Sequence, residues 1–301
     1  MINGTGGGSS HALSRPLFIL SLLTALLALA AAGGLFWPRA GEPFRFTTLR
    51  GGEIEIYGRG LYTYDWAFRA PILRGTDGVM LFIGVPLLLT VLWAARRGGP
   101  RSRLLLTSLL GVTLYNAASV AFGVAFNPFF PVYLAYFSAS LFAFVLAFST
   151  VDLGGLAAAT SLRLPHRGIA LFVILASLSP GVWLFELLPA LAQGEAPASI
   201  ASYTTDVTAL LDLGIILPAG ILGGVLLWRR RPLGMLLSCV LLTLLTLTGL
   251  IVAGQTAMMA LEGNVPSAGE TALCVVPFLL LSLIAVGLLA VLLRYVDMNA
   301  E

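Results

Sequence analysis

Four carboxyl-bearing residues lie at or inside long apolar stretches of the chain, where an ionisable group is unusual. Asp212 is expected about one helical turn below the end of such a stretch, Glu186 near the end of the preceding one, and Asp77 at the start of an earlier one. A charge inside a membrane costs roughly 2.5–3.5 kcal/mol on insertion scales, so these groups are functional candidates. With Asp206 they predict an acidic vestibule in which Asp212 titrates or coordinates a cation.

A structural interpretation of the same acids is also open. In this interpretation Asp212 and Glu186 pair with arginines of a neighbouring loop, with Arg69 and Arg74 as the candidate partners. Asp77 and Asp206 are well placed to cap the helices that they precede. We favour capping for these two residues, and both interpretations of Asp212 stay open.

Amides and prolines mark the same stretches. Asn116 and Gln255 each lie in an apolar run, where a side-chain amide either joins two helices, for roughly 0.6 kcal/mol, or lines a solute path. Pro180 and Pro218 are expected to break two helices beside the acids. Transporters build sites at such breaks, although kinks without a function are more common.

Several kinds of chemistry are excluded by what the chain lacks. Neither of its 2 histidines lies in an apolar run, which excludes a bis-histidine haem or a His-ligated zinc site inside a membrane. All 17 basic residues are arginine, so a lysine Schiff base or P-loop contact cannot form. Cys239 and Cys274 do not form a Cys-x-x-Cys pair, and no disulfide between them is expected. We therefore expect no metal and no cofactor.

Membrane helices must position these residues. The chain of 301 residues is 58% hydrophobic and 10% charged, whereas soluble domains are about 45–50% apolar and about 25% charged. This composition excludes a soluble enzyme, a disordered chain and a disulfide-stapled secreted domain. Runs long enough to cross about 30 Å of hydrocarbon occur at 17–37, 78–95, 104–126, 131–149, 169–188, 208–228, 235–260 and 273–293. The predicted fold class is an all-α polytopic membrane protein with about eight transmembrane helices.

The positions of the arginines predict the orientation. Arginines gather in the loops between runs two and three, four and five, and six and seven, whereas the loops at 189–207 and 261–272 contain acids and no basic residue. The positive-inside rule then places both termini in the cytoplasm. The lack of lysine and the abundance of alanine, leucine and glycine favour a bacterial cytoplasmic membrane. The net charge of +3 is small and dispersed, so no nucleic-acid partner is expected.

Residues 38–77 form the one sizeable loop, here named the cap, which is expected outside. The sequence predicts a strand, a turn, a second strand and a third strand at 45–49, 50–52, 53–57 and 61–64. Residues 66–73 have helical spacing, interrupted at Pro71, and are predicted to lie in the outer interface. Run one is interpreted as a retained helix, because its apolar part exceeds the usual 7–15 residues of a signal peptide.

The two halves of the chain are candidates for a 4+4 parallel internal repeat. In each half a helix begins near an acid, contains a proline and ends in tryptophan and arginine, and the next helix carries an amide. Common interface anchors and membrane prolines also explain this pattern. The expected divisions are a cytoplasmic tail, a first half that includes the cap, a cytoplasmic linker and a second half, at 1–16, 17–149, 150–168 and 169–301.

Two segments resemble uncharacterised bacterial multi-pass inner-membrane proteins. They are 60–65 (Gly-Leu-Tyr-Thr-Tyr-Asp) followed by 74–77 (Arg-Gly-Thr-Asp), and 211–218 with the later Arg-Arg-Pro-Leu-Gly. The resemblance implies a helical inner-membrane protein and a shared pattern that includes Asp65, Asp77 and Asp212. It implies no activity, substrate or catalytic residue.

The leading functional hypothesis is binding or transport of a small solute or cation through the acidic vestibule, with lipid as the surrounding partner. The first alternative is a membrane-embedded enzyme that acts on lipid or a lipid-linked substrate, with Asp65 or Asp77 as an acid or metal ligand. The second alternative is an accessory subunit whose cap docks a partner protein. A role other than catalysis is favoured.

Overall fold

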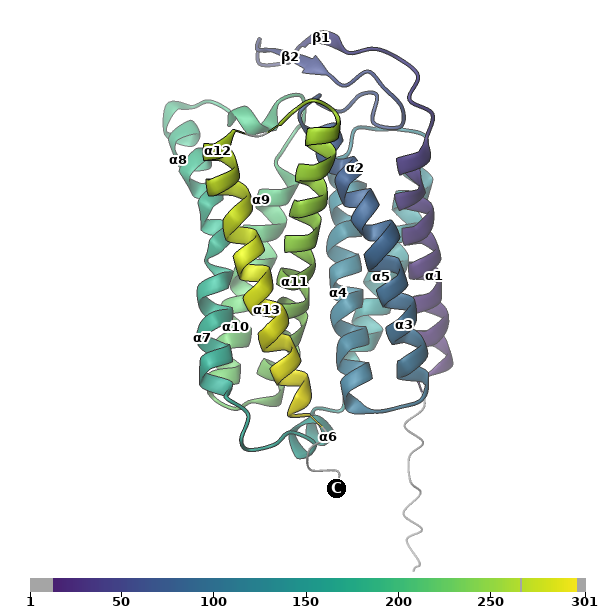
Figure 1. Ribbon diagram of the computed structural model, residues 1–301, viewed down its shortest axis with the longest axis vertical. Coiled ribbons are helices and arrows are strands. Elements are labelled where there is room, and N and C mark those ends of the chain that lie inside the picture. The colour runs from purple at the N-terminus through teal and green to yellow at the C-terminus, as the bar shows by residue number, and fades with distance from the viewer. Residues whose placement is uncertain (1–12, 266, 297–301) are drawn as a thin grey trace, which may run out of the picture.

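The computed structural model describes residues 13–265 and 267–296. Within them, eight helices lie side by side in a bundle, and each is long and apolar enough to cross a membrane (Figure 1). In chain order the spans are Arg15–Phe36, Arg69–Arg96, Pro100–Gly123, Phe130–Ser149, His166–Gln193, Val207–Trp228, Pro232–Leu261 and Val276–Arg294. The prediction of eight transmembrane helices is confirmed, and the chain is a polytopic membrane protein.

Several spans consist of more than one helical element. The α-helices are α1 (Arg15–Ala32), α2 (Arg69–Val79), α3 (Val85–Arg96), α4 (Pro100–Gly123), α5 (Phe130–Ser149), α6 (Leu153–Ala158), α7 (His166–Ser177), α8 (Leu184–Gln193), α9 (Val207–Leu211), α10 (Leu217–Trp228), α11 (Pro232–Leu261), α12 (Ala268–Glu270) and α13 (Val276–Arg294). The pairs α2–α3, α7–α8 and α9–α10 each form one span. The short α6 crosses the end of the bundle opposite the cap, which we call the base (Figure 1).

Prolines explain where the spans depart from α-helical geometry. Five-residue π-helical turns end two residues before Pro86, Pro218 and Pro277, at Met80–Gly84, Asp212–Ile216 and Thr271–Val275. Proline lacks the N–H that an α-helix needs, and a wider turn absorbs the missing hydrogen bond. Pro180 lies in the 3-10 segment Ser179–Trp183 that joins α7 to α8. The predicted breaks at Pro180 and Pro218 are therefore present.

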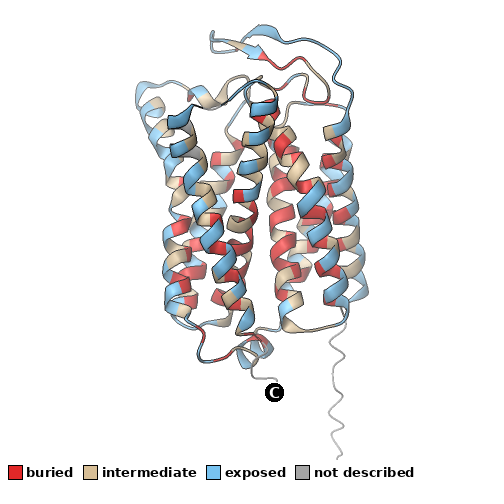
Figure 2. Cartoon of the chain, viewed as in Figure 1, coloured by how far each residue is buried: buried red, intermediate tan, exposed pale blue. Residues whose placement is uncertain are grey.

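The long helix α11 lies at the centre of the packing. It contacts α2, α4, α10 and α13, while α1 and α4 pack against α5 and α7 packs against α10. Buried residues face the inside of the bundle and exposed ones its outer surface (Figure 2). Large apolar side chains are on that surface, including Phe185 at 83% exposed and Leu283 at 68%. Lipid contact accounts for such a surface, which a water-soluble bundle would bury.

The cap contains the predicted hairpin. Strand β1 (Phe44–Thr47) pairs antiparallel with β2 (Glu53–Ile56), with Phe44 opposite Ile56. The third strand predicted at 61–64 is wrong, because these residues lie in turns. Gly58 and Gly60 have left-handed φ angles of 68° and 63°, which bend the chain back on itself. A single bridge between Ile56 and Trp66 is what remains of a third strand.

The second span begins at Arg69, nine residues before the start predicted at 78. Pro71 is the third residue of α2, within the first turn, where the missing N–H is tolerated because it would have no partner within the helix. The separate interfacial helix predicted at 66–73 is therefore wrong. The predicted capping role of Asp77 is also wrong, because Asp77 lies inside α2. Asp206 does cap its helix: its side chain accepts a hydrogen bond from the Ala209 N–H, 3.0 Å away, at the start of α9.

Candidate functional site

Asp212 is the first residue of the π-helical turn between α9 and α10. It is the sixth residue of its span, about 7.5 Å along the helix axis from the first residue. The Tyr115 hydroxyl of α4 donates to Oδ1 at 2.7 Å, and the Trp183 indole N–H donates to Oδ2 at 3.0 Å. Both carboxyl oxygens are therefore held by neutral donors that come from two other spans.

Asp212 has another acid nearby and no ion pair among the described residues. The Asp206 carboxylate lies close enough to act on Asp212 electrostatically. The ion pairs in the described part of the chain involve Glu262 and Glu53. Since lipid makes an uncompensated charge costly, this carboxyl group is suited to bind a proton or a cation.

Arg74, expected beside Asp212 or Glu186, instead pairs with Glu262 just beyond the end of α11. Glu262 also accepts a hydrogen bond from the Tyr57 hydroxyl at 2.8 Å and lies 3.3 Å from the Arg39 guanidinium. The Glu262 side chain is only 5% exposed. These contacts fasten the cap to α11, so the expected role of an arginine in holding the cap is present with a different acid.

Glu186 and Arg69 have other partners than those predicted. The Glu186 carboxylate accepts a hydrogen bond from the Ser199 N–H, 2.8 Å away, in the loop that follows α8. The Arg69 guanidinium lies over the Tyr203 ring, 4.6 Å from its centroid. The predicted pairing of Asp212 and Glu186 with Arg69 or Arg74 is therefore wrong.

Asp65 is a fully buried residue of the cap. Its Oδ1 accepts hydrogen bonds from the Tyr203 hydroxyl at 2.7 Å and from the Ala125 N–H at 2.9 Å. Burial raises the pKa of Asp65 to about 6, although these two hydrogen bonds and the charge of Arg69 act to lower the pKa. Burial, followed by the charge of Asp65, raises the pKa of Tyr203. Asp65 thus joins the cap to the loops after α4 and before α9.

Asp77 lies below Asp65 in a buried layer of tyrosines and amides. The Tyr62 hydroxyl donates to Asp77 Oδ2 at 2.6 Å, and Asp77 is 5% exposed. The Tyr136 hydroxyl donates to Asn116 Oδ1 at 3.2 Å. Asp65 Oδ2 is buried and has no hydrogen-bond partner among the described residues, while the Tyr133 hydroxyl lies within interaction range of Tyr62 and Asn127. The layer is thus a connected set of hydroxyl, amide and carboxyl groups.

Gln255 reaches across to another helix. Its Nε2 donates to Thr76 Oγ1 at 2.8 Å, next to Asp77. At the same level α2 and α11 approach closely, because a side chain at Gly75 would overlap the backbone of Gly254 and Gln255. The amide therefore forms an interhelical contact of the kind that joins membrane helices.

The sequence interpretation missed the aromatic partners of the acids. Tyr62, Tyr115, Trp183 and Tyr203 each donate to a carboxylate. Tyrosine and tryptophan are common at membrane interfaces for packing reasons alone, so their presence did not single them out. A signal was available at 60–65, where tyrosines alternate with small residues just before Asp65.

The described residues hold no group of three or more histidine, cysteine, aspartate or glutamate side chains that could hold a metal. Cys239 is a buried free thiol. The Cys274 side chain lies outside what the structure describes.

No family model, curated protein or solved structure matches this chain. The resemblance to bacterial inner-membrane proteins is thus supported only at the level of a multi-pass helical architecture. Functional inference has to come from the site itself.

Proposed function

We propose that this polytopic membrane protein binds or transports a small cation or a proton-coupled solute, and that Asp212 is the group that takes up the cation or proton. One observation carries the proposal: a carboxyl group inside a span is held by two neutral donors and has no ion pair among the described residues. The positive-inside rule places this end of the bundle outside the cytoplasm. Ligand then enters from the cap side.

The wide turn at Asp212 supports the same proposal. A π-helical turn adds a residue to the helix and is frequently found at functional sites, where it aims a side chain differently from its neighbours. Here the turn begins at Asp212 and precedes Pro218. Glu186 and Asp206 add negative charge to the same end of the bundle. This charge raises the local concentration of cations in the water at that end.

The pattern of contacts also supports an internal repeat. Thr76 of span two meets Gln255 of span seven, and Asp212 of span six meets Tyr115 of span three. A two-fold axis that exchanges span two with span six and span three with span seven also exchanges these two contacts. The π-helical turns before Pro86 and Pro218 fall at equivalent places, although span eight has such a turn as well.

The lipid-enzyme alternative has less support. It relied on Asp65 or Asp77 as the reacting acid, and these residues are 0% and 5% exposed. A lipid headgroup has no route to them in this conformation.

Thermal unfolding of the purified protein tests the proposal. Melting temperatures are measured over a pH series and over concentration series of Na⁺, K⁺ and NH₄⁺. We expect one of these cations to stabilise the wild type and Asp212→Asn to lose that stabilisation at every pH, because an amide keeps the shape and loses the charge. Glu42→Gln, which neutralises an exposed acid of the cap, is the matched control and should respond like the wild type.

Two outcomes count against Asp212 as the site. The first is an unchanged response in Asp212→Asn, and the second is an equal loss in Glu42→Gln. Tyr115→Phe adds a finer test, because it removes one donor to Asp212 and leaves the ring in place. It should alter the response without abolishing it.

A further inference from the structure

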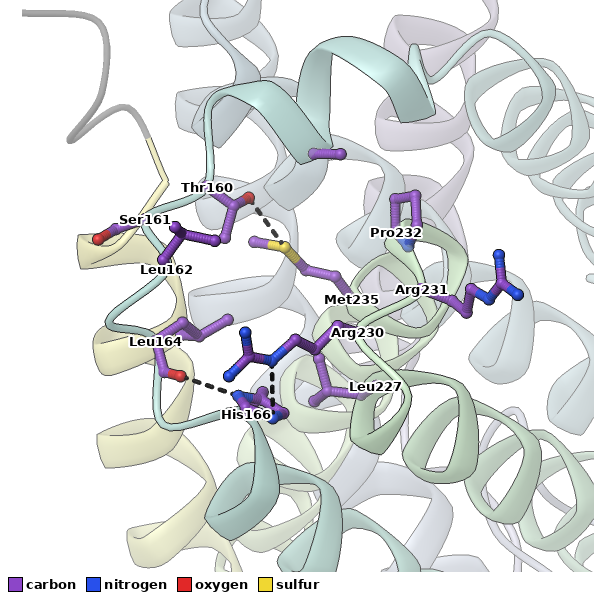
Figure 3. A pocket seen from close by; sticks show the side chains of 11 residues that line it. Thr160, Ser161, Leu162, Leu164, His166, Leu227, Arg230, Arg231, Pro232 and Met235 are labelled. Atoms are coloured by element: carbon purple, nitrogen blue, oxygen red, sulfur yellow. Dashed lines mark hydrogen bonds between the residues drawn. The ribbon is translucent and has the colours of Figure 1, made fainter.

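A cavity of about 120 Å³ opens at the base of the bundle, far from Asp212. Its walls come from the segment between α6 and α7 and from the tight turn between α10 and α11 (Figure 3). Arg230, Arg231 and His166 supply its basic groups, and Thr160 and Ser161 supply hydroxyl groups. Among the residues that the structure describes, none of those lining the cavity is acidic.

The turn at 229–231 aims one arginine into this cavity. Arg230 has a left-handed φ of 55°, which is uncommon for a residue with a side chain. Its Nε donates to His166 Nε2 at 3.1 Å, and His166 Nδ1 lies 3.2 Å from the Leu164 carbonyl oxygen (Figure 3). The imidazole therefore accepts from Arg230 on one side and donates to the backbone on the other. This chain of hydrogen bonds orients the guanidinium group toward the cavity.

The guanidinium groups of Arg230 and Arg231 have no acidic partner among the described residues. Asp152 lies five residues before Ala157, the first residue that lines the cavity, and its carboxylate accepts a hydrogen bond from the Gly155 N–H at the start of α6. Arginine presents a planar fork of donors that matches phosphate oxygens in pairs. Arg230 presents such a fork to the cavity, whereas the Arg231 side chain extends away from Arg230 (Figure 3). The Arg230 fork selects for a phosphate-bearing anion.

The remaining wall of the cavity is apolar. Leu164, Leu227 and Met235 are buried there, and Leu162 stands at the rim at 84% exposed. Trp228, with the Arg167 guanidinium 5.8 Å from its ring centroid, lies next to the turn at 229–231. A tryptophan at the end of a span marks the level of the lipid headgroups. The cavity thus combines an apolar wall with basic groups at the depth where headgroup and acyl chain meet.

We propose that this cavity binds a phosphate-bearing anion, and that its source is an anionic phospholipid headgroup. Basic cavities between transmembrane helices are a known form of site for such headgroups. A soluble phosphate compound offers the same chemistry, and the experiment separates the two sources. This proposal does not depend on the one made for Asp212.

The test uses the full chain in a neutral detergent. Native mass spectrometry measures retention of phosphatidylglycerol and phosphatidylcholine, and thermal unfolding measures stabilisation by inorganic phosphate. The variants are Arg230→Gln and Arg231→Gln. Arg229→Gln is the matched control, because it removes the same charge from the same turn and Arg229 does not line the cavity.

We expect phosphatidylglycerol to be retained in preference to phosphatidylcholine. Arg230→Gln should weaken retention about tenfold, the change that corresponds to one lost charge-assisted hydrogen bond, and Arg229→Gln should have little effect. If Arg230→Gln abolishes stabilisation by inorganic phosphate and phosphatidylglycerol is not preferred, the cavity is assigned to a soluble phosphate compound, which supports the shared chemistry. Equal effects of all three substitutions, or no response to either probe, would overturn the proposal.

Discussion

Replacing Asp65 by asparagine should remove a pH-dependent loss of stability from the protein. Asp65 is fully buried, and burial raises its pKa from an ordinary 3.8 to about 6. The folded state therefore binds a proton at this site more tightly than the unfolded state does. Stability from this group is fully present below about pH 4, declines as the pH rises to about 6, and is constant above that value.

The size of the effect follows from the two pKa values. At about 1.4 kcal/mol for each tenfold change in proton affinity, the difference between 3.8 and about 6 is worth about 3 kcal/mol. Asparagine keeps the Oδ1 acceptor for the Tyr203 hydroxyl and the Ala125 N–H and carries no charge at any pH. Between pH 3 and pH 7, the free energy of unfolding of the wild type should thus fall by about 3 kcal/mol more than that of Asp65→Asn.

Unfolding by SDS in mixed micelles, followed by tryptophan fluorescence at several pH values, measures this difference. Glu42→Gln changes an exposed acid of the same loop and should keep the wild-type pH dependence. Tyr203→Phe removes a donor that lowers the pKa of Asp65, so its loss of stability should extend to higher pH. If Asp65→Asn keeps the wild-type slope, the assigned role of burial at Asp65 is refuted.

Two further substitutions test how the cap half is held to α11. Gly75→Ala should destabilise the protein by about 1–3 kcal/mol, because the added methyl group overlaps the backbone at Gln255; the SDS midpoint measures this, and an unchanged midpoint would contradict the close crossing. Glu262→Gln should cost about 3–5 kcal/mol, because it leaves the largely buried Arg74 without its acid. The control is Glu53→Gln, because Glu53 is exposed and lies 4.0 Å from its arginine partner. This substitution should cost less than about 1 kcal/mol. Similar losses of stability in Glu262→Gln and Glu53→Gln would contradict the stabilising role of the Glu262 ion pair.

The spans and the hairpin could be predicted because their signals are local. The length of an apolar run can be counted directly in the sequence. The turn at 50–52 contains two adjacent glycines, of which Gly51 has a left-handed φ of 83°. The start of the second span was missed for a local reason as well. A proline such as Pro71 predicts an interruption inside a helix, whereas in the first turn of a helix it is tolerated.

The partners of the charged groups could not be predicted, because they depend on which helices become neighbours. Arg74 and Glu262 are 188 residues apart in the chain, and Tyr115 and Asp212 are 97 apart. Hydropathy shows that each residue lies near the end of a span, and several acids and arginines satisfy that condition equally. Only the packing of α2 against α11, and of α4 against α9, selects the actual pairs.

The length of α11 has a mechanical consequence. Its 30 residues extend about 45 Å, which exceeds the hydrocarbon thickness of about 30 Å. One end therefore stands among the cap residues that hold Glu262, and the other begins at the arginine turn beside the basic cavity. Because α11 is one continuous helix, a substitution that shifts it along its axis at one end is expected to disturb the contacts at the other end.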